Sequence, residues 1–311
     1  MKINYRIPNK LEGHRIVTIG NFDGVHKGHQ SLLKLCFDFA KKNQIISTVI
    51  TFNPHPKVVL QNRPHGCIQT LRDKAKEIKG AKIDELLIIP FNERLANLPA
   101  QKFIELLIDH LGMRAIVVGK DFRFGKARGG NVKMLLQMGK SLKFKTYIAE
   151  NILHENEKVS SSQIRSFARK GLLDEVSYYR GKLLTLTGRV VHGKKIGRTL
   201  GYPTLNIRVP DDLCISGIFA VSVSELRGKK IPHSLLGIAS LGRRPTVENC
   251  GKLILEVHIL DWNLEIYGQL ISVEIHKKIR EEIKFDNLEA LKKQMKLDEV
   301  KTRQFFELNE K

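Results

Sequence analysis

The feature that most constrains the fold of this chain is an alternation of two hydrophobic periods between residues 14 and 150. Helical patterns occupy Ser31–Lys42, Leu71–Gly80, Pro99–Leu111 and Val132–Gly139. Between them lie short, continuous runs of Ile, Val and Leu, typical of strands buried on both faces, at Arg15–Ile19, Ile45–Phe52, Glu85–Pro90, Arg114–Gly119 and Phe144–Ala149. Alternating strands and helices build parallel sheets, so the sequence predicts an α/β doubly wound parallel-sheet domain. Such sheets bind ligands at the carboxyl ends of their strands.

The pattern changes near residue 182. Ser160–Lys170 and Leu172–Arg180 are predicted helices that close the first domain, and short alternating segments separated by glycines follow from residue 183. That spacing is typical of an antiparallel barrel or sandwich. Apolar residues at helical spacing in Asn287–Leu308 predict a terminal helix. We therefore expect an α/β domain over 1–182 and an all-β antiparallel barrel domain with a C-terminal helix over 183–311.

Length and composition narrow the class of protein. A chain of 311 residues has room for about two domains. No apolar run approaches the ~18 residues that cross a bilayer, and the first residues lack the apolar core of a signal peptide. The four cysteines form no Cys-x-x-Cys pair, which excludes a disulfide-dense scaffold and disfavours a zinc ribbon. We expect a soluble cytoplasmic protein with reduced thiols and no membrane partner.

The net charge of +21 is concentrated in the first 182 residues, which hold 32 Lys and Arg against 16 acidic residues. A basic half suits nucleic acid, but it also suits a polyphosphate substrate. A third possibility is a lysine-rich surface without a specific partner. Charge alone does not choose among these three.

A glycine-rich segment with two histidines follows the first predicted strand and opens the first helix. Its loop residues are Gly20, Asn21, Phe22, Asp23 and Gly24, and its histidines are His26 and His29. Glycines let the backbone approach a phosphate, and a helix amino terminus offers free N–H groups and positive potential. Histidines three residues apart can face one anion and donate to a phosphorus centre as charge builds there. This placement predicts a nucleotide site.

A serine-rich segment at the far end of the first domain supports this prediction. Ser160, Ser161 and Ser162 stand at another helix amino terminus, and Arg165 follows a turn later. Hydroxyls, free N–H groups and a guanidinium suit a triphosphate. Together, His-x-Gly-His and the late Ser-Ser-x-x-Ile-Arg resemble the nucleotidyltransferase superfamily, which transfers a nucleotidyl group from a nucleoside triphosphate and releases pyrophosphate.

Two further segments end predicted strands of the same domain. Thr51–Pro56 follows the second strand and Val118–Gly125 the fourth, and their aromatic residues are able to flank a planar ring. All four segments together resemble the bacterial bifunctional riboflavin kinase/FAD synthetase family, in which this half adenylylates FMN to FAD. The resemblance implies flavin contacts from Pro54, His55, Pro56, Asp121, Phe122 and Phe124. The family often has an acid where Asn131 stands and usually Thr where Ser162 stands.

The second domain opens with a loop dense in glycine and cations, Gly188–Asn206, which is not a Walker A loop. Such a loop can close over phosphates; its candidate nucleotide contacts are Gly193, Gly197 and Arg198. Thr204 and Asn206 lie two residues apart on one strand face, and their oxygens are hard donors suited to Mg²⁺ held jointly with phosphates. The whole string resembles the flavokinase signature.

Glu256 lies in an apolar strand and points opposite to Leu255 and Val257. A carboxylate near an alcohol can take its proton during attack on a γ-phosphate, although a strand Glu commonly faces solvent. By resemblance, Glu256 matches the family's base, which activates the 5′-hydroxyl of riboflavin. One departure is Ser240-Leu241-Gly242, where the family usually carries Asn-Ile-Gly.

The resemblance spans about residues 14–306 and implies a bifunctional enzyme of flavin cofactor biosynthesis. It would phosphorylate riboflavin to FMN and adenylylate FMN to FAD, with ATP as co-substrate and Mg²⁺ as cofactor. Two alternatives stay open. In the first, one activity is lost, for which Asn131 and Ser240 are the only support. In the second, the basic half binds RNA or DNA, although its cations are dispersed rather than interleaved with aromatics. We expect no nucleic-acid partner; the oligomeric state is open.

Overall fold

The structure is a computed structural model that describes residues 1–150, 153–154, 157–193, 201–226, 229–243, 251–262 and 266–309. Contacts divide the chain into two compact units. The first contains Met1–His65 and Lys74–Ser161, and the second contains Gly66–Asp73 and Ser162–Lys311. Each unit has its own sheet.

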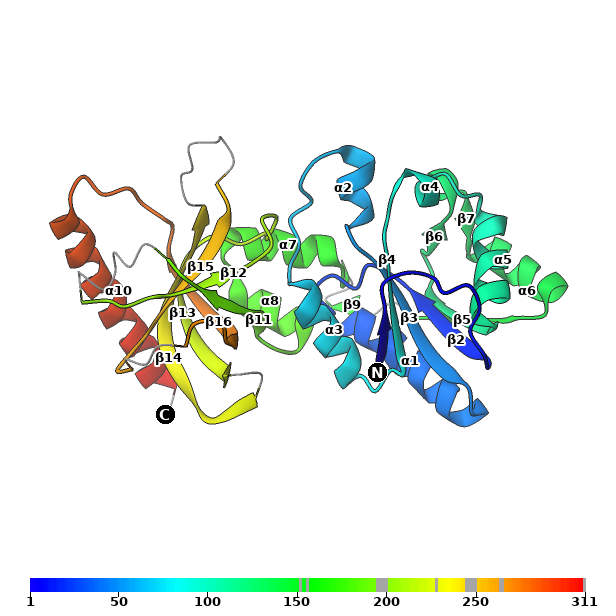
Figure 1. Ribbon diagram of the computed structural model, residues 1–311, viewed down its shortest axis with the longest axis horizontal. Coiled ribbons are helices and arrows are strands. Elements are labelled where there is room, and N and C mark those ends of the chain that lie inside the picture. The colour runs from blue at the N-terminus through cyan, green and yellow to red at the C-terminus, as the bar shows by residue number, and fades with distance from the viewer. Residues whose placement is uncertain are drawn as a thin grey trace. The chain divides into compact units, whose positions relative to one another are not determined.

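The first unit is built on a six-stranded sheet in the order β1-β4-β3-β2-β5-β8 (Figure 1). All adjacent strands in this sheet run parallel. The strands are β1 (Lys2–Asn4), β2 (Arg15–Ile19), β3 (Ile46–Phe52), β4 (Glu85–Ile89), β5 (Met113–Gly119) and β8 (Lys145–Ala149). The predicted parallel α/β sheet is confirmed. The three-residue β1 was not predicted.

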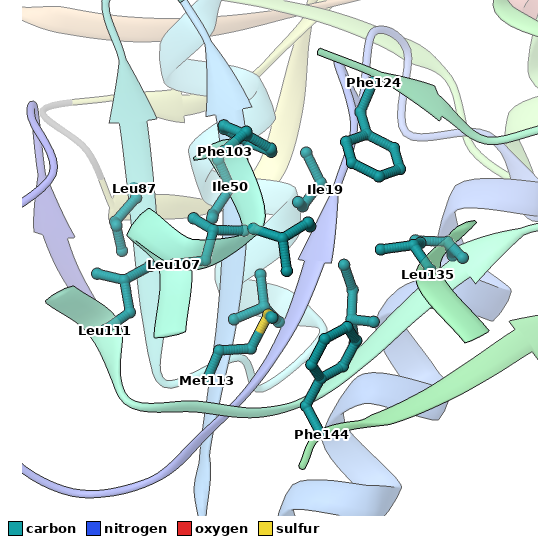
Figure 2. Close-up of a cluster of buried hydrophobic side chains, with 14 of the residues drawn as sticks. Ile19, Ile50, Leu87, Phe103, Leu107, Leu111, Met113, Phe124, Leu135 and Phe144 are labelled. Carbon is teal, nitrogen blue, oxygen red and sulfur yellow. The ribbon is translucent and has the colours of Figure 1, made fainter. Parts of the chain in front are cut away.

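The helices along this part of the chain are α1 (Lys27–Asn43), α2 (Pro56–Gln61), α3 (Leu71–Gly80), α4 (Glu93–Ala96), α5 (Ala100–Leu111) and α6 (Val132–Leu142). Of these, α1, α5 and α6 pack against the strands of the sheet. One core cluster joins Phe103 and Leu107 of α5 and Leu135 of α6 to strand residues such as Ile19 and Ile50 (Figure 2). Because side chains alternate along a strand, Ile16 faces the other side, where Cys36 of α1 donates to its carbonyl. The site therefore rests on a sheet buried on both faces.

The strand order places one loop at a natural ligand position. The chain passes from β2 outward through β3 to β4, and β5 then returns to the opposite side of β2. The carboxyl ends of β2 and β5 therefore meet where the winding direction reverses, which is the usual ligand position in such sheets. The loop that follows β2 is the glycine-histidine segment.

Several local features differ from the sequence prediction. Helix α1 begins at Lys27 rather than Ser31, because His26 caps it. Pro99 is the cap of α5 rather than its first residue, and Gly112 ends that helix with φ of 62° as predicted. Asn131 caps α6 by accepting from the amide of Met134. Short elements lie between β5 and α6, namely β6 (Arg123–Phe124), η1 (Lys126–Arg128) and β7 (Gly130–Asn131); β9 (Leu153–His154) pairs with β10 (Glu157–Lys158).

The second unit contains a closed barrel in the order β11-β12-β15-β14-β13-β16. All its strand pairs are antiparallel. The strands are β11 (Leu184–Val191), β12 (Leu205–Arg208), β13 (Gly217–Leu226), β14 (Lys229–Arg243), β15 (Leu253–Ile259) and β16 (Leu270–Arg280). Helix α10 (Leu288–Asn309) packs against β13, β14 and β16 (Figure 1). The predicted barrel with a C-terminal helix is confirmed.

Contacts group three other segments with the barrel. These are α7 (Ser161–Lys170) from its second residue, α8 (Leu173–Arg180), and the segment Gly66–Asp73. In this segment, Asp73 accepts from the amide of Thr187 at 3.0 Å, and Gln69 accepts from the fully buried Arg180 at 3.1 Å. The compact units thus differ from a simple division of the chain at residue 182.

Among the helices that the structure describes, none is long and apolar enough to span a bilayer.

Candidate functional sites

The loop after β2 has an unusual backbone. Phe22 and Val25 adopt positive φ values of 47° and 33°, and Gly24 has φ of 80°. Positive φ is strained for non-glycine residues, above all for β-branched Val. The side chains of Phe22 and Val25 are buried, which holds this conformation in place. The turn brings His26 to the amino terminus of α1.

His26 and His29 form a stacked pair, with ring centroids 3.7 Å apart. The Nδ1 atom of His26 accepts from the backbone amide of His29, so its proton must lie on Nε2, which is a donor. Burial lowers the pKa of His29 well below its usual value, and the charges of His26 and Lys74 lower it further. A ring with such a pKa is neutral near pH 7. The His29 ring can therefore donate a hydrogen bond without carrying a positive charge.

The serine-rich segment meets this loop within the first unit. Ser161 donates from its hydroxyl to the carbonyl of Asp23 at 2.8 Å, and Ser160 precedes it in the same unit. Ser162 and Arg165 belong to the second unit, where Arg165 is buried and donates to the carbonyl of Gly66 at 2.6 Å. The structure thus joins the two predicted phosphate segments through Ser161. A phosphate role for Ser162 and Arg165 stays a prediction.

A cavity of about 410 Å³ opens at the carboxyl ends of the strands. Gly20 and Asn21 line it, so it shares the loop that carries the histidine pair. Five of the six predicted flavin contacts line this cavity, namely His55, Pro56, Asp121, Phe122 and Phe124. Pro54 follows Asn53 through a cis peptide bond and is not a lining residue.

Aromatic rings form the walls of this cavity. Phe122 and Phe124 are stacked at 5.4 Å, and Phe52 meets Phe91 edge-on at 5.6 Å. Flat apolar walls of this kind suit a planar ring system. Sequence reasoning missed Phe91, Leu95 and the cations Lys57, Arg123 and Arg128. These residues lie in the segments that follow β3, β4 and β5. In the sequence, only the spacing of apolar residues around α4 indicated any of them.

Glu256 occupies the middle of a row that crosses adjacent barrel strands. Its register partners are Asn206 on β12 and Ser240 on β14. Because Leu255 and Val257 are buried in the barrel, Glu256 faces outward, as the alternation predicted. The row continues from Ser240 to Ile218 on β13 and then to Arg280 on β16.

A second cavity, of about 370 Å³, lies against this outer face and beneath α10. Glu256, Thr204, Tyr202 and His258 form its polar wall, and Ser240 and Glu282 extend that wall. The apolar wall consists of Ile218, Ile238, Ile283, Phe285, Leu291 and Met295. The lining therefore combines polar and apolar side chains, which are neighbours in places, because Ile238 lies opposite His258 and Ile218 opposite Ser240 in the strand register. Sequence reasoning missed Tyr202, His258 and the α10 residues, because they come from three separate segments of the chain.

Helix α10 is fastened to the barrel by two ion pairs. Arg280 donates to both carboxylate oxygens of the buried Asp298. Arg303 donates to both oxygens of the exposed Asp261 at 2.8 Å. The Tyr202 hydroxyl also donates to Glu299 of this helix at 3.2 Å. Burial and the charge of Glu299 raise the pKa of Tyr202. These contacts fix the roof of the second cavity.

The predicted metal ligands lie at the edge of this site. Thr204 lines the cavity, whereas Asn206 is 5% exposed and packs against Gly193, where an added Cβ would overlap the Asn206 amide. No cluster of three or more His, Cys, Asp or Glu able to hold a metal occurs among the residues that the structure describes. A hydroxyl, an amide oxygen and the neighbouring Glu256 carboxylate are hard donors that fit Mg²⁺ only with further ligands from a substrate. Gly197 and Arg198 lie outside the described residues.

Comparison with known proteins identifies the family of this chain. A family model for FAD synthetase matches residues 9–163, and one for riboflavin kinase matches residues 180–306. The chain belongs to the bifunctional riboflavin kinase/FMN adenylyltransferase family. The expected enzyme of flavin cofactor biosynthesis, with an adenylyltransferase domain before a kinase domain, is confirmed.

Relatives cover almost the whole chain. The bifunctional riboflavin kinase/FMN adenylyltransferase of Buchnera aphidicola subsp. Schizaphis graminum is 38% identical over 96% of each chain. The Escherichia coli K12 protein of the same name is 36% identical over 94% of this chain and 93% of its own. A crystal structure of a macrolide-efflux protein from Streptococcus pneumoniae has a TM-score of 0.78 at 29% identity, covering 97% of this chain and 99% of that one.

Proposed function

We propose that the two cavities divide the two reactions of this family. The first unit would transfer AMP from ATP to FMN, giving FAD and pyrophosphate. The second would transfer the γ-phosphoryl group of ATP to riboflavin, giving FMN and ADP. The observation that carries this assignment is the chemistry of each cavity: one shares Gly20 and Asn21 with the loop that carries the histidine pair, and the other is lined by Glu256.

In the adenylyl transfer, the phosphate oxygen of FMN attacks the α-phosphorus of ATP and the bond to pyrophosphate breaks. Charge grows on the phosphoryl oxygens in the transition state, and fixed donors there stabilise it. His26 and His29 supply such donors beside the amino terminus of α1. Gly20 and Asn21 are common to the loop and to the cavity, so a flavin ring held among the phenylalanines would direct its phosphate toward the histidines.

In the kinase reaction, the 5′-hydroxyl of riboflavin attacks the γ-phosphorus, and its proton passes to the carboxylate of Glu256. The bond to ADP then breaks. Glu256 is suited to this role because it lines the cavity from a rigid strand flanked on both sides. The apolar wall would hold the ring system, which leaves the polyol chain at the polar wall.

The second site fits a Mg²⁺ ion that is held jointly by oxygens of the protein and of ATP. Thr204 and Asn206 would hold it, with oxygens that match its preference. When bound, it would neutralise charge on the triphosphate. Asn206 is positioned for this by its close contact with Gly193 on one side and its register with Glu256 on the other.

Two residues that depart from the family have partners in the structure. Asn131 caps α6, and Ser240 donates to Glu282 at 3.2 Å. Both departures therefore have a structural role, and neither by itself argues for a decayed domain.

A product time course tests whether the two reactions take place at separate sites. The full chain is incubated with riboflavin, ATP and MgCl₂, and riboflavin, FMN and FAD are separated over time. FMN should appear first and FAD later. In His29→Ala, FMN should accumulate without FAD, and in Glu256→Gln, FAD should form only from supplied FMN. Loss of FMN formation in His29→Ala, or loss of FAD formation from supplied FMN in Glu256→Gln, with the fold intact, would contradict two separate sites.

A further inference from the structure

A second carboxylate lies on the polar wall of the kinase cavity, beyond Glu256. Glu282 follows β16, and its Oε1 atom accepts from the hydroxyl of Ser240 at 3.2 Å. An added Cβ at Gly242 would overlap both carboxylate oxygens of Glu282. The absence of a side chain at Gly242 therefore makes room for this carboxylate against the strand backbone.

Ser240 connects Glu282 to the proposed base. It lies directly opposite Glu256 in the register of β14 and β15, where side chains on one face are about 5 Å apart. Burial raises the pKa of the Glu282 carboxyl, the hydrogen bond from Ser240 opposes that rise, and the negative charge of Glu256 adds to it. The two carboxylates therefore face the same space.

The ion pairs around Glu282 involve other residues. Arg280 is committed to Asp298, and Glu281 pairs with Lys278 at 2.7 Å. Among the described residues, Ser240 is the hydrogen-bond partner of Glu282. A carboxylate has about four acceptor positions, so most of them stay available to a ligand. A carboxylate placed on a cavity wall with this spare capacity suits hydroxyl donors.

Riboflavin presents such donors next to its reacting group. If its 5′-hydroxyl lies at Glu256 and its rings lie on the apolar wall, the other ribityl hydroxyls pass close to Ser240 and Glu282. We propose that Glu282, oriented by Ser240 and accommodated by Gly242, accepts a hydrogen bond from a ribityl hydroxyl and so selects for the polyol chain. This inference rests on the proposed placement of riboflavin in the second cavity.

Binding of two flavins to the full chain tests the inference. Riboflavin carries the polyol, whereas lumiflavin has the same rings with a methyl group in its place. In fluorescence titrations, Glu282→Ala should weaken riboflavin about tenfold or more, as expected for a lost charge-assisted hydrogen bond. Lumiflavin should bind as to the unchanged chain. Glu282→Gln keeps one acceptor and should recover part of the loss.

Two further variants separate position from charge. Glu281→Ala removes the adjacent carboxylate, whose side chain reaches only Lys278 in the described structure, and should leave both flavins unaffected. Gly242→Ala should displace the Glu282 carboxylate and weaken riboflavin alone. Adding Gly242→Ala to Glu282→Ala should cause little further loss. The cooperative urea unfolding of the barrel, followed in the full chain, serves as the check that each variant is folded.

Ile238→Phe, on the apolar wall, tests the placement itself and should weaken both flavins. If it does so while Glu282→Ala changes neither, the cavity assignment stands and the role of Glu282 is wrong. If Ile238→Phe changes neither flavin, riboflavin binds elsewhere and the proposed kinase site is wrong. Equal weakening of riboflavin and lumiflavin by Glu282→Ala would show a structural role and would also overturn the inference.

Discussion

Replacing Asp298 by Asn should loosen the helix that covers the kinase cavity. Asp298 is 3% exposed, and its carboxylate accepts hydrogen bonds from Nε and Nη2 of Arg280 at 2.7 to 3.1 Å. An amide offers one acceptor oxygen and turns an N–H₂ group toward the guanidinium donors. Arg280 would then keep its positive charge with little compensation. Breaking a buried pair in this way costs about 3–5 kcal/mol.

The expected cost here is nearer the lower end of that range, at about 3 kcal/mol. The Arg280 side chain keeps 17% of its surface exposed, which lets water compensate part of its charge. In a unit of this size, such a loss lowers the melting temperature by about 10 °C. Leu291 and Met295 of the same helix line the cavity, so KM for riboflavin should rise as well.

Thermal inactivation of the two activities in the full chain measures this effect. FMN formation by Asp298→Asn should be lost at a lower temperature than in the unchanged chain, whereas FAD formation from supplied FMN should not shift. Asp261→Asn is a matched control, because Asp261 binds Arg303 of the same helix through two contacts but is exposed. It should change little. Equal shifts for both variants would refute the argument from burial.

Four other predictions follow from the two sites and their surroundings. His29→Ala should slow FAD formation about 10²–10³-fold by removing one fixed donor, with FMN formation unchanged in a product assay. Glu256→Gln should lose about 10²–10⁴ in the rate of FMN formation at any Mg²⁺ concentration, whereas Asn206→Ala should recover in part as MgCl₂ is raised; a normal Glu256→Gln kinase would exclude Glu256 as the base. Burial lowers the pKa of His276 in the folded chain, so the unfolded chain takes up its proton first, and the unfolding free energy of the barrel should fall from pH 7.5 to 5.5; urea titrations of His276→Gln should show a smaller fall, and an equal fall would contradict this. The fragment 183–311 should phosphorylate riboflavin without making FAD, at a lower urea midpoint than the full chain because the amide of Thr187 loses Asp73; a folded but inert fragment would contradict the domain assignment.

Those parts of the fold that depend on local pattern could be predicted from the sequence. The strands of the first sheet appear as apolar runs because both faces are buried, and Gly112 marks a helix end because the required φ is positive. In contrast, Arg15 begins one of these apolar strands and is itself buried. Its partner is Glu85 at 2.8 Å, the first residue of another strand. A pairing across 70 residues leaves no local signal.

The same limit applies to the two sites. The histidines, Ser161 and Glu256 lie in short contiguous motifs, so their residue types and spacing were informative. Phe91 and Glu282 reach their cavities only through tertiary structure. The exchange of Asn for Ser at position 240 was visible in the sequence, but its partner was not, because Glu282 lies 42 residues away.

The segment Gly66–Asp73 imposes an order on how the chain is made. It leaves the ribosome early, yet Arg180 and Thr187, which bind it, are synthesised more than a hundred residues later. At typical elongation rates, this delay is roughly ten seconds. During that time, the amino-terminal sheet can form, whereas the polar groups of these eight residues stay bonded to water. A gene for the kinase half that begins at residue 183 omits them, so a fusion or transplant of this half should gain stability when they are supplied as a separate peptide or grafted onto its start.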